Sequence, residues 1–233
     1  MSVVRWEWGL AIALSLLLPA MSLVRRERLA ARSGAAFLAL GDSYTIGEKV
    51  DAVDRWPVQL AGILRARRLQ VADPVIVART GWTTDELDSG ITAVAPVGPF
   101  ALVTLSIGVN NQFRGGDLQR YGSEFGSLLA RAVAFAGGKP ERVLVLSIPD
   151  WGVTPFAAGR DRRKIAAEID RFNAVNREAS RRAGASYVDV TTTSREEHQR
   201  WLTTDGLHPS PAQYRRWAEL ALDGATAALR SAR

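Results

Sequence analysis

Short apolar runs alternate along the chain with longer segments in which apolar residues recur at helical spacing. Short runs bounded by turn residues are typical of strands buried on both faces, and the longer segments are typical of amphipathic helices. The predicted strands span residues 36–40, 75–78, 100–107, 142–148 and 186–190. The predicted helices span residues 55–70, 117–136, 160–183 and 210–230, with a shorter helix that Thr83 or Thr84 caps and that runs through Ile91.

Strands that alternate with helices of this length predict one α/β domain, a three-layer α/β/α sandwich around a five-stranded parallel sheet. Ligands of such sheets bind at the carboxyl ends of the strands. Turn residues and polar side chains follow these strand ends, so we expect them to meet in one crevice. They are Gly41-Asp42-Ser43, Gly81, the stretch Gly108 to Asn111 and the loop around Trp151, joined by a late turn with Asp205 and His208.

The composition permits this fold and removes several kinds of chemistry. A chain of 233 residues and 25.3 kDa is long enough for one sizeable domain with its own core. Because there is no cysteine, disulfides, thiolate metal sites and cysteine nucleophiles are excluded. His198 and His208 are the only histidines, which argues against a multi-histidine metal site, so we expect no metal and no cofactor.

The chain is basic, with a formal net charge of +6 and a sequence pI near 10.3. Such a balance can indicate a nucleic-acid partner or a membrane surface. Here the arginines are scattered over the predicted helices, with no nucleic-acid motif and no interleaved aromatic residues, so we interpret them as solvated helix faces and expect no nucleic-acid partner. Examples are Arg65, Arg67, Arg68, Arg160, Arg162, Arg163, Arg181 and Arg182.

The first 33 residues are set apart from the predicted domain, which spans residues 34–233. Residues 9–21 are almost wholly apolar and follow Arg5, as in the core of a signal peptide. An arginine-rich lead follows this run directly. Positive charge on that side favours keeping the rest of the chain in the cytoplasm, which is the expected location.

Three other interpretations of this segment stay open. Residues 3–24 could direct export or tether the protein to a membrane, and membrane contact is expected only through them. The apolar run itself is short for a spanning helix, and extending it brings Glu7 inside. Translation could also begin at Met21.

Ser43 follows the first predicted strand and is the candidate nucleophile. A serine hydroxyl needs a base to remove its proton, usually a histidine that a carboxylate orients. His208 lies in a turn with Asp205 three residues earlier, so one turn can hold the carboxylate against the imidazole and fix its tautomer. His198 lies in a charged run typical of a solvated surface. We therefore predict Ser43, Asp205 and His208 as catalytic, with loop capping as the alternative for His208.

Attack on an acyl carbon also needs donors for the oxygen that becomes negative. The backbone N–H of Ser43 is one candidate if a helix starts there, and the N–H of Gly81 is another because glycine allows a close approach to substrate. The side-chain amide of Asn110 is a third. Taken singly, Gly81 could be a turn glycine and Asn110 an Asx-turn residue.

These motifs, in this order, resemble those of the SGNH hydrolases, also called the GDSL family of esterases and lipases. They are Gly41-Asp42-Ser43-Tyr44, Gly81, Gly108-Val109-Asn110-Asn111 and Asp205-Gly206-Leu207-His208. The resemblance covers the chain from about Phe37 to the C-terminus and implies the flavodoxin-like SGNH hydrolase fold. It implies Ser43 as nucleophile, Asp205 and His208 as acid and base, and oxyanion donors at Ser43, Gly81 and Asn110. The family often has Asp where Asn111 stands, so one carboxylate near the site is missing here.

The resemblance predicts a serine carboxylester hydrolase of the esterase or lipase type that forms an acyl-enzyme on Ser43. Its partner would be a small-molecule ester, and the oligomeric state is left open. Two alternatives also stay open. One is a carbohydrate O-acetylesterase with the same mechanism, and the other is a non-catalytic binding module that keeps the fold.

Several loop residues that face the predicted crevice are candidates for lining a substrate pocket. They are Trp82, Asn111, Phe113, Trp151 and Phe156. The alternative for these side chains is that they anchor their loops. Arg79 and Arg114 lie near the predicted site and are candidates for contacts with an anionic substrate.

Overall fold

The computed structural model describes residues 34–196 and 201–232. The predicted N-terminal segment, residues 1–33, and the predicted surface residue His198 lie outside the described residues. Within the described part of the chain, no helix combines the length and the apolar character needed to cross a membrane.

Five strands form one parallel sheet in the order β2-β1-β3-β4-β5, which confirms the predicted α/β class. They are β1 (Phe37–Gly41), β2 (Val75–Ala78), β3 (Leu102–Ser106), β4 (Val143–Leu146) and β5 (Ser186–Val188). Every residue of β1, β3 and β4 is buried, as expected for apolar strands covered on both faces. The predicted strands 100–107 and 186–190 run past the observed ones, because the apolar pattern continues into the turns.

The strand order places the topological switch point of the sheet between β1 and β3. From β1 the chain moves outward to β2, then crosses back to form β3 on the other side of β1. Gly41 at the end of β1 is paired with Ser106 at the end of β3, so the two carboxyl ends lie at the same level. Open α/β sheets bind ligands in the crevice at such a point.

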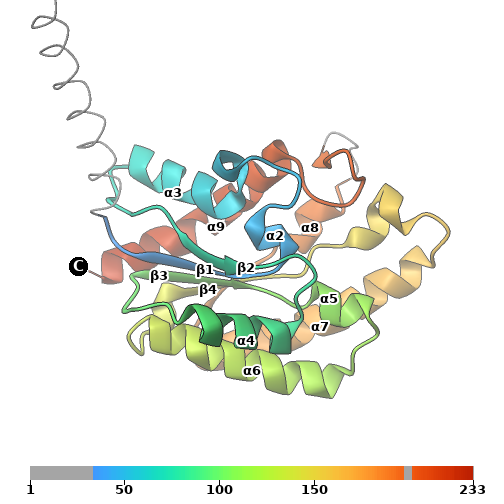
Figure 1. Cartoon of the computed structure of the whole chain (residues 1–233), viewed down its shortest axis with the longest axis horizontal. Helices are drawn as coiled ribbons and strands as arrows, with labels where there is room; N and C mark the ends of the chain where they lie inside the picture. The colour runs from blue at the N-terminus through green and yellow to red at the C-terminus, as the bar shows by residue number, and fades with distance from the viewer. Residues whose placement is uncertain (1–33, 197–200, 233) are drawn as a thin grey trace, which may run out of the picture.

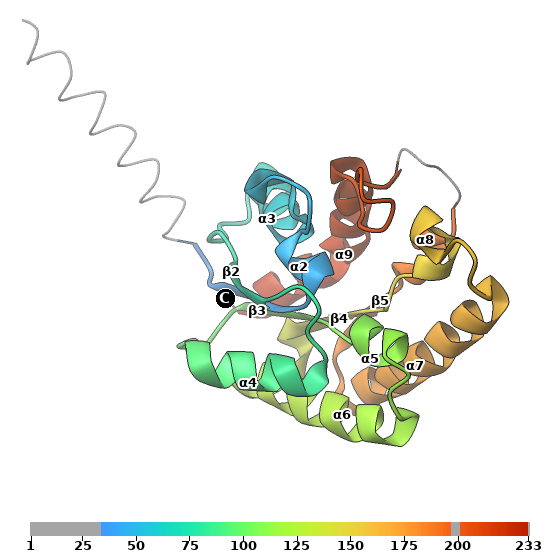
Figure 2. The ribbon, with the colours of Figure 1, turned by 45° about the vertical axis from the view of Figure 1, so that its right-hand side comes forward.

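Helices cover both faces of the sheet (Figure 1), and Figure 2 shows the same layers from the side. One face carries α3 (Trp56–Ala66) and α9 (Pro211–Ser231), and the other carries α4 (Thr84–Val94), α6 (Leu118–Phe135) and α7 (Arg162–Ala183). Between α3 and the sheet, Trp56 is fully buried, as is Trp217 of α9. Burying side chains of this size supplies much of the hydrophobic stabilisation of the layer.

Capping residues fix where α4 and α7 begin and where α7 ends. The N–H of Thr83 donates to the Glu86 carboxylate at 2.8 Å, so Thr83 rather than Thr84 caps α4. Asp161 caps α7, and Gly184 ends it in the left-handed conformation that glycine adopts without strain.

Three short helices were not predicted, because four or five residues are too few to show a helical period. They are α2 (Ser43–Ile46), α5 (Val109–Phe113) and α8 (Thr191–Ser194), and they follow β1, β3 and β5. All three therefore begin at the carboxyl edge of the sheet. The structure also has 3-10 turns η1 (Ala52–Asp54), η2 (Pro140–Arg142), η3 (Trp151–Val153) and η4 (Pro155–Ala157).

Candidate active site

The sharp turn from β1 into α2 presents Ser43. Gly41 is required there, because a Cβ at this position would lie 2.5 Å from the carbonyl oxygen of Ser106. Asp42 caps α2, and its Oδ1 accepts a hydrogen bond from the N–H of Tyr44 at 3.0 Å. Ser43 is thus the first residue of α2, and the N–H groups of a first helical turn have no acceptor within the helix. This arrangement leaves the Ser43 N–H available to a ligand oxygen.

One turn near the end of the chain holds an aspartate against a histidine. Asp205 Oδ2 lies 2.7 Å from His208 Nδ1. Its Oδ1 accepts three further hydrogen bonds, from the N–H groups of Leu207 at 2.9 Å and His208 at 3.0 Å and from the Thr203 hydroxyl at 2.8 Å. Burial alone would raise the pKa of Asp205, but these hydrogen bonds outweigh it and hold the pKa well below its usual range. The carboxylate therefore stays ionised, keeps the proton on Nδ1 and leaves Nε2 able to accept one.

Ser43, His208 and Asn110, the predicted nucleophile, base and side-chain oxyanion donor, line the same cavity, of about 100 Å³. Ser43 is 5% exposed within it. The residues around this cavity are Ser43, Tyr44, Val109, Asn110, Phe113, Trp151, Phe156, Leu207 and His208. The structure thus brings together Ser43, Asn110 and His208, with Asp205 behind the histidine, from three separate parts of the chain.

The side-chain amide of Asn110 is held at this cavity from α5. Its Nδ2 donates to the carbonyl oxygen of Trp82 at 2.9 Å. An amide nitrogen carries two hydrogens, so this bond fixes the side chain and leaves the second hydrogen for another acceptor. Gly81 has φ +86°, a conformation that favours glycine, and its carbonyl accepts from Arg114 Nη2 at 2.7 Å. The loop after β2 is therefore tied to α5 and its end at two points.

Two of the predicted pocket residues face elsewhere. Asn111 hydrogen-bonds to Thr84 at the start of α4, with Oδ1 accepting from the N–H at 3.1 Å and Nδ2 donating to Oγ1 at 2.8 Å. These two bonds hold the Asn111 side chain against Thr84, whereas Val109, Asn110 and Phe113 of α5 line the cavity. The ring of Trp82 packs on Gly90 of α4, where a Cβ would come within 2.1 Å of it. Neither residue lines the small cavity, and both side chains contact α4.

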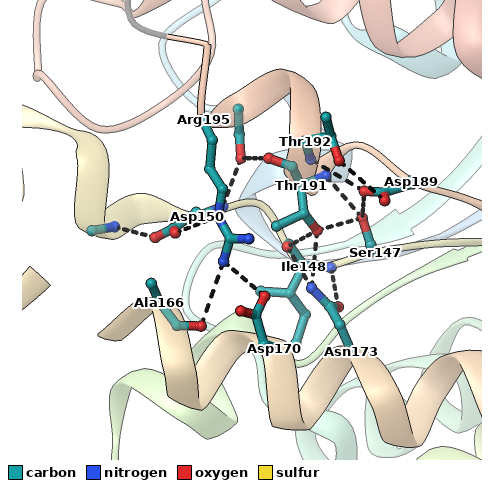
Figure 3. Close-up of polar contacts among 12 residues, drawn as sticks. Ser147, Ile148, Asp150, Ala166, Asp170, Asn173, Asp189, Thr191, Thr192 and Arg195 are labelled. Atoms are coloured by element: carbon teal, nitrogen blue, oxygen red, sulfur yellow. Dashed lines mark hydrogen bonds and ion pairs between the residues drawn. The ribbon is translucent and has the colours of Figure 1, made fainter. Parts of the chain in front are cut away.

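Trp151 lines the small cavity, and its loop is held by residues that the sequence analysis did not single out. The indole Nε1 of Trp151 donates to Gln112 Oε1 at 2.8 Å. The neighbouring Asp150, which is 2% exposed, accepts from Arg195 Nε at 2.8 Å, and Arg195 also reaches Asp170 at 2.7 Å (Figure 3). Gln112 and Arg195 therefore fix the loop that carries Trp151. Neither belongs to a motif, and their roles depend on contacts between distant segments.

A second, larger cavity of about 690 Å³ lies beside the first. The two share Tyr44, Trp151 and Leu207 as walls. A molecule that is too large for the small cavity therefore has room next to it.

Asp42 lies in the same turn as Ser43 and is almost fully buried. Burial raises the pKa of its carboxyl to about 7, despite the hydrogen bond from the N–H of Tyr44. In an unfolded chain the pKa of this carboxyl is about 3.9. Between these two pH values the folded protein keeps a proton that the unfolded chain has released, so the free energy of unfolding falls as the pH rises towards about 7.

Asp42→Asn is expected to gain stability relative to the wild-type protein as the pH rises from about 4 to about 8. Asn caps a helix about as well as Asp, but it cannot ionise. The difference in the free energy of unfolding should therefore change by a few kcal/mol across this range, on the order of 1.4 kcal/mol for each pH unit between the two pKa values. Urea unfolding at about pH 4.5 and about pH 8 measures it, and a difference that is independent of pH would contradict the expectation.

Known proteins resemble this chain both in sequence pattern and in fold. The model of the GDSL-like lipase/acylhydrolase family matches residues 39–216. No curated protein sequence is similar enough to the chain to match it. Solved structures of other proteins share its fold.

A structure of TesA has a TM-score of 0.64 and 21% sequence identity, with 81% of this chain and 97% of that chain covered. The psychrotrophic esterase EstA from Pseudoalteromonas sp. has a TM-score of 0.62 and 14% identity, with 82% and 97% covered. The acetylxylan esterase Axe2 from Geobacillus stearothermophilus has a TM-score of 0.63 and 18% identity, with 84% and 96% covered.

Proposed function

Because the chain belongs to the GDSL-like lipase/acylhydrolase family, we propose that it is a serine esterase that hydrolyses carboxylic esters through an acyl-enzyme on Ser43. One observation carries the proposal. Ser43, Asn110 and His208 line a single cavity, and Asp205 holds the histidine from behind at 2.7 Å. A nucleophile, an oriented base and an oxyanion donor are the parts that acyl transfer requires.

In the first step His208 Nε2 takes the proton of Ser43 Oγ as this oxygen attacks the carbonyl carbon of the ester. The carbonyl oxygen becomes negative and is stabilised by the N–H groups of Ser43 and Gly81 and the amide of Asn110. The bond from carbon to the alcohol oxygen then breaks, and His208 gives its proton to the departing alcohol. Ser43 is left carrying the acyl group.

In the second step water replaces the alcohol. His208 Nε2 takes a proton from the water as its oxygen attacks the acyl carbon. The bond from this carbon to Ser43 Oγ breaks, Oγ recovers its proton from His208, and the free acid leaves. The ionised Asp205 stabilises the imidazolium in both steps, which is consistent with its lowered pKa.

The size of the cavity favours a short acyl group. The small cavity has a volume of about 100 Å³, against about 690 Å³ for its neighbour. An acetyl group fits such a space, whereas a long acyl chain would extend beyond it. The alcohol part lies outside the small cavity.

The protein is expected to hydrolyse p-nitrophenyl acetate with a kcat/KM at least about tenfold higher than that for p-nitrophenyl octanoate, because each methylene that does not fit costs transition-state binding. A series of acyl chain lengths at constant alcohol measures this. A preference for long chains would contradict the assignment of the small cavity. Failure to hydrolyse any ester, together with no reaction with a serine-directed probe, would favour a non-catalytic module.

A carbohydrate O-acetylesterase is the second candidate, and the small cavity favours it because acetyl is the acyl group removed. Axe2, an acetylxylan esterase, shares the fold at 18% identity. Release of acetate from acetylated xylo-oligosaccharides at a higher kcat/KM than from p-nitrophenyl acetate would favour this candidate over a simple carboxylesterase.

A further inference from the structure

Three aromatic rings form one cluster at the mouth of the small cavity. Phe113 lies 5.2 Å from Trp151 and 6.0 Å from Phe156, and Trp151 lies 6.0 Å from Phe156, measured between ring centroids. Trp151 is buried, whereas Phe113 is 41% exposed and Phe156 is 42% exposed. The cluster therefore has one side in the cavity wall and another side that is open to solvent.

The guanidinium of Arg160 stands over all three rings. Its Cζ lies 5.1 Å from the centroid of Phe113, 5.4 Å from that of Trp151 and 5.8 Å from that of Phe156. These contacts are within the range of cation–π attraction and hold the cation in place. Arg160, Trp151 and Phe156 belong to the connection between β4 and α7, whereas Phe113 comes from α5.

Arg160 differs from Arg114, Arg162 and Arg195 in having no acceptor for its guanidinium. Within residues 34–196 and 201–232, no carboxylate forms an ion pair with its guanidinium and no oxygen accepts a hydrogen bond from it. By contrast, Arg114 donates to the Gly81 carbonyl and to Glu86, Arg162 donates to the Thr154 carbonyl, and Arg195 binds Asp150 and Asp170. The predicted anion contact of Arg114 is thus already used within the protein.

We propose that Arg160 makes the enzyme selective for esters whose alcohol part carries an anionic group. This rests on the proposed esterase function, with the acyl group held in the small cavity and the alcohol part leaving it past the exposed rings of Phe113 and Phe156. A guanidinium that is held through its contacts with rings still offers N–H donors that match a carboxylate in two-point geometry. An alcohol part with an aromatic or flat body would cover the rings and place its anionic group at Arg160.

The test compares two acetate esters that differ in charge alone at the far end of the alcohol, 4-carboxyphenyl acetate and 4-carbamoylphenyl acetate. Their ratio of kcat/KM is measured for the wild-type protein, for Arg160→Gln and for Arg163→Gln. Comparing ratios between proteins cancels the intrinsic difference in reactivity of the two esters. Arg163 is an exposed residue in the first turn of α7, so its change removes the same net charge away from the rings.

Arg160→Gln is expected to lower kcat/KM for the anionic ester by about three- to fivefold at low ionic strength, with little change for the neutral ester. Arg163→Gln should leave the ratio unchanged, Arg160→Lys should retain part of the preference, and added salt should reduce it in the wild-type protein. An equal loss for both esters in Arg160→Gln, or no loss, would overturn the proposal and leave Arg160 as a support for the aromatic wall. If the wild-type protein hydrolysed neither ester, the esterase function itself would fail.

Discussion

Ser43→Ala is expected to lower kcat for ester hydrolysis by about 10⁴- to 10⁶-fold, because the change removes the only atom that forms the covalent bond with the acyl group. The fold should survive, since the turn is built by Gly41 and by the cap of Asp42, not by the Ser43 hydroxyl. The measurement is hydrolysis of p-nitrophenyl acetate by purified protein, with thermal unfolding as the check on folding.

Covalent labelling gives the same prediction a second readout. A fluorophosphonate probe should add one label to the wild-type protein, on the peptide that contains Ser43, and none to Ser43→Ala. Ser127→Ala is the matched control, because Ser127 is exposed on α6 and its hydroxyl donates to the Ser123 carbonyl of the preceding turn. His208→Ala should also lose the label, whereas a change at His198 should not. Activity of Ser43→Ala within tenfold of wild type would refute the acyl-enzyme.

The parts of the site that could be predicted are those whose geometry is local in the sequence. Asp205 and His208 are three residues apart, so one turn decides whether they touch. The strand at 75–78 was bounded correctly because the turn residues on both sides end its apolar run. The carboxyl ends of parallel strands lie at one edge of the sheet, which is why Ser43 and Asn110 could be expected to lie in one crevice.

The parts that could not be predicted depend on side-chain direction and on contacts between distant segments. Asn110 and Asn111 are identical residue types, and only the start of α5 decides which of them faces the cavity. Trp82 is an aromatic residue of the kind that often lines pockets. Its ring instead packs against α4, because Gly90 has no side chain there. The position of Arg160 over three rings requires the folded arrangement of the loops, so no pattern in the sequence indicates it.

Asp205→Asn is expected to lower kcat by about 10⁴-fold while leaving the structure of the turn intact, because it places the wrong partner against the histidine. Oδ1 of Asp205 accepts from the N–H groups of Leu207 and His208 and from the Thr203 hydroxyl. In the variant these three donors will bind the amide oxygen, since an amide nitrogen cannot accept from them. The amide NH₂ must then occupy the position of Oδ2, 2.7 Å from His208 Nδ1 in the wild-type protein.

A donor at that position forces His208 to accept through Nδ1 and to carry its proton on Nε2. Nε2 then has no lone pair with which to take the proton from Ser43, so acylation fails even though every group is in place. Nitrogen NMR of the histidine ring should show the exchanged tautomer in Asp205→Asn, which a merely loosened turn would not produce. Thr203→Val removes one donor to Oδ1 but keeps the carboxylate, so it should cost no more than about tenfold in kcat. A tautomer and a kcat that stay close to wild type in Asp205→Asn would mean that another group orients His208.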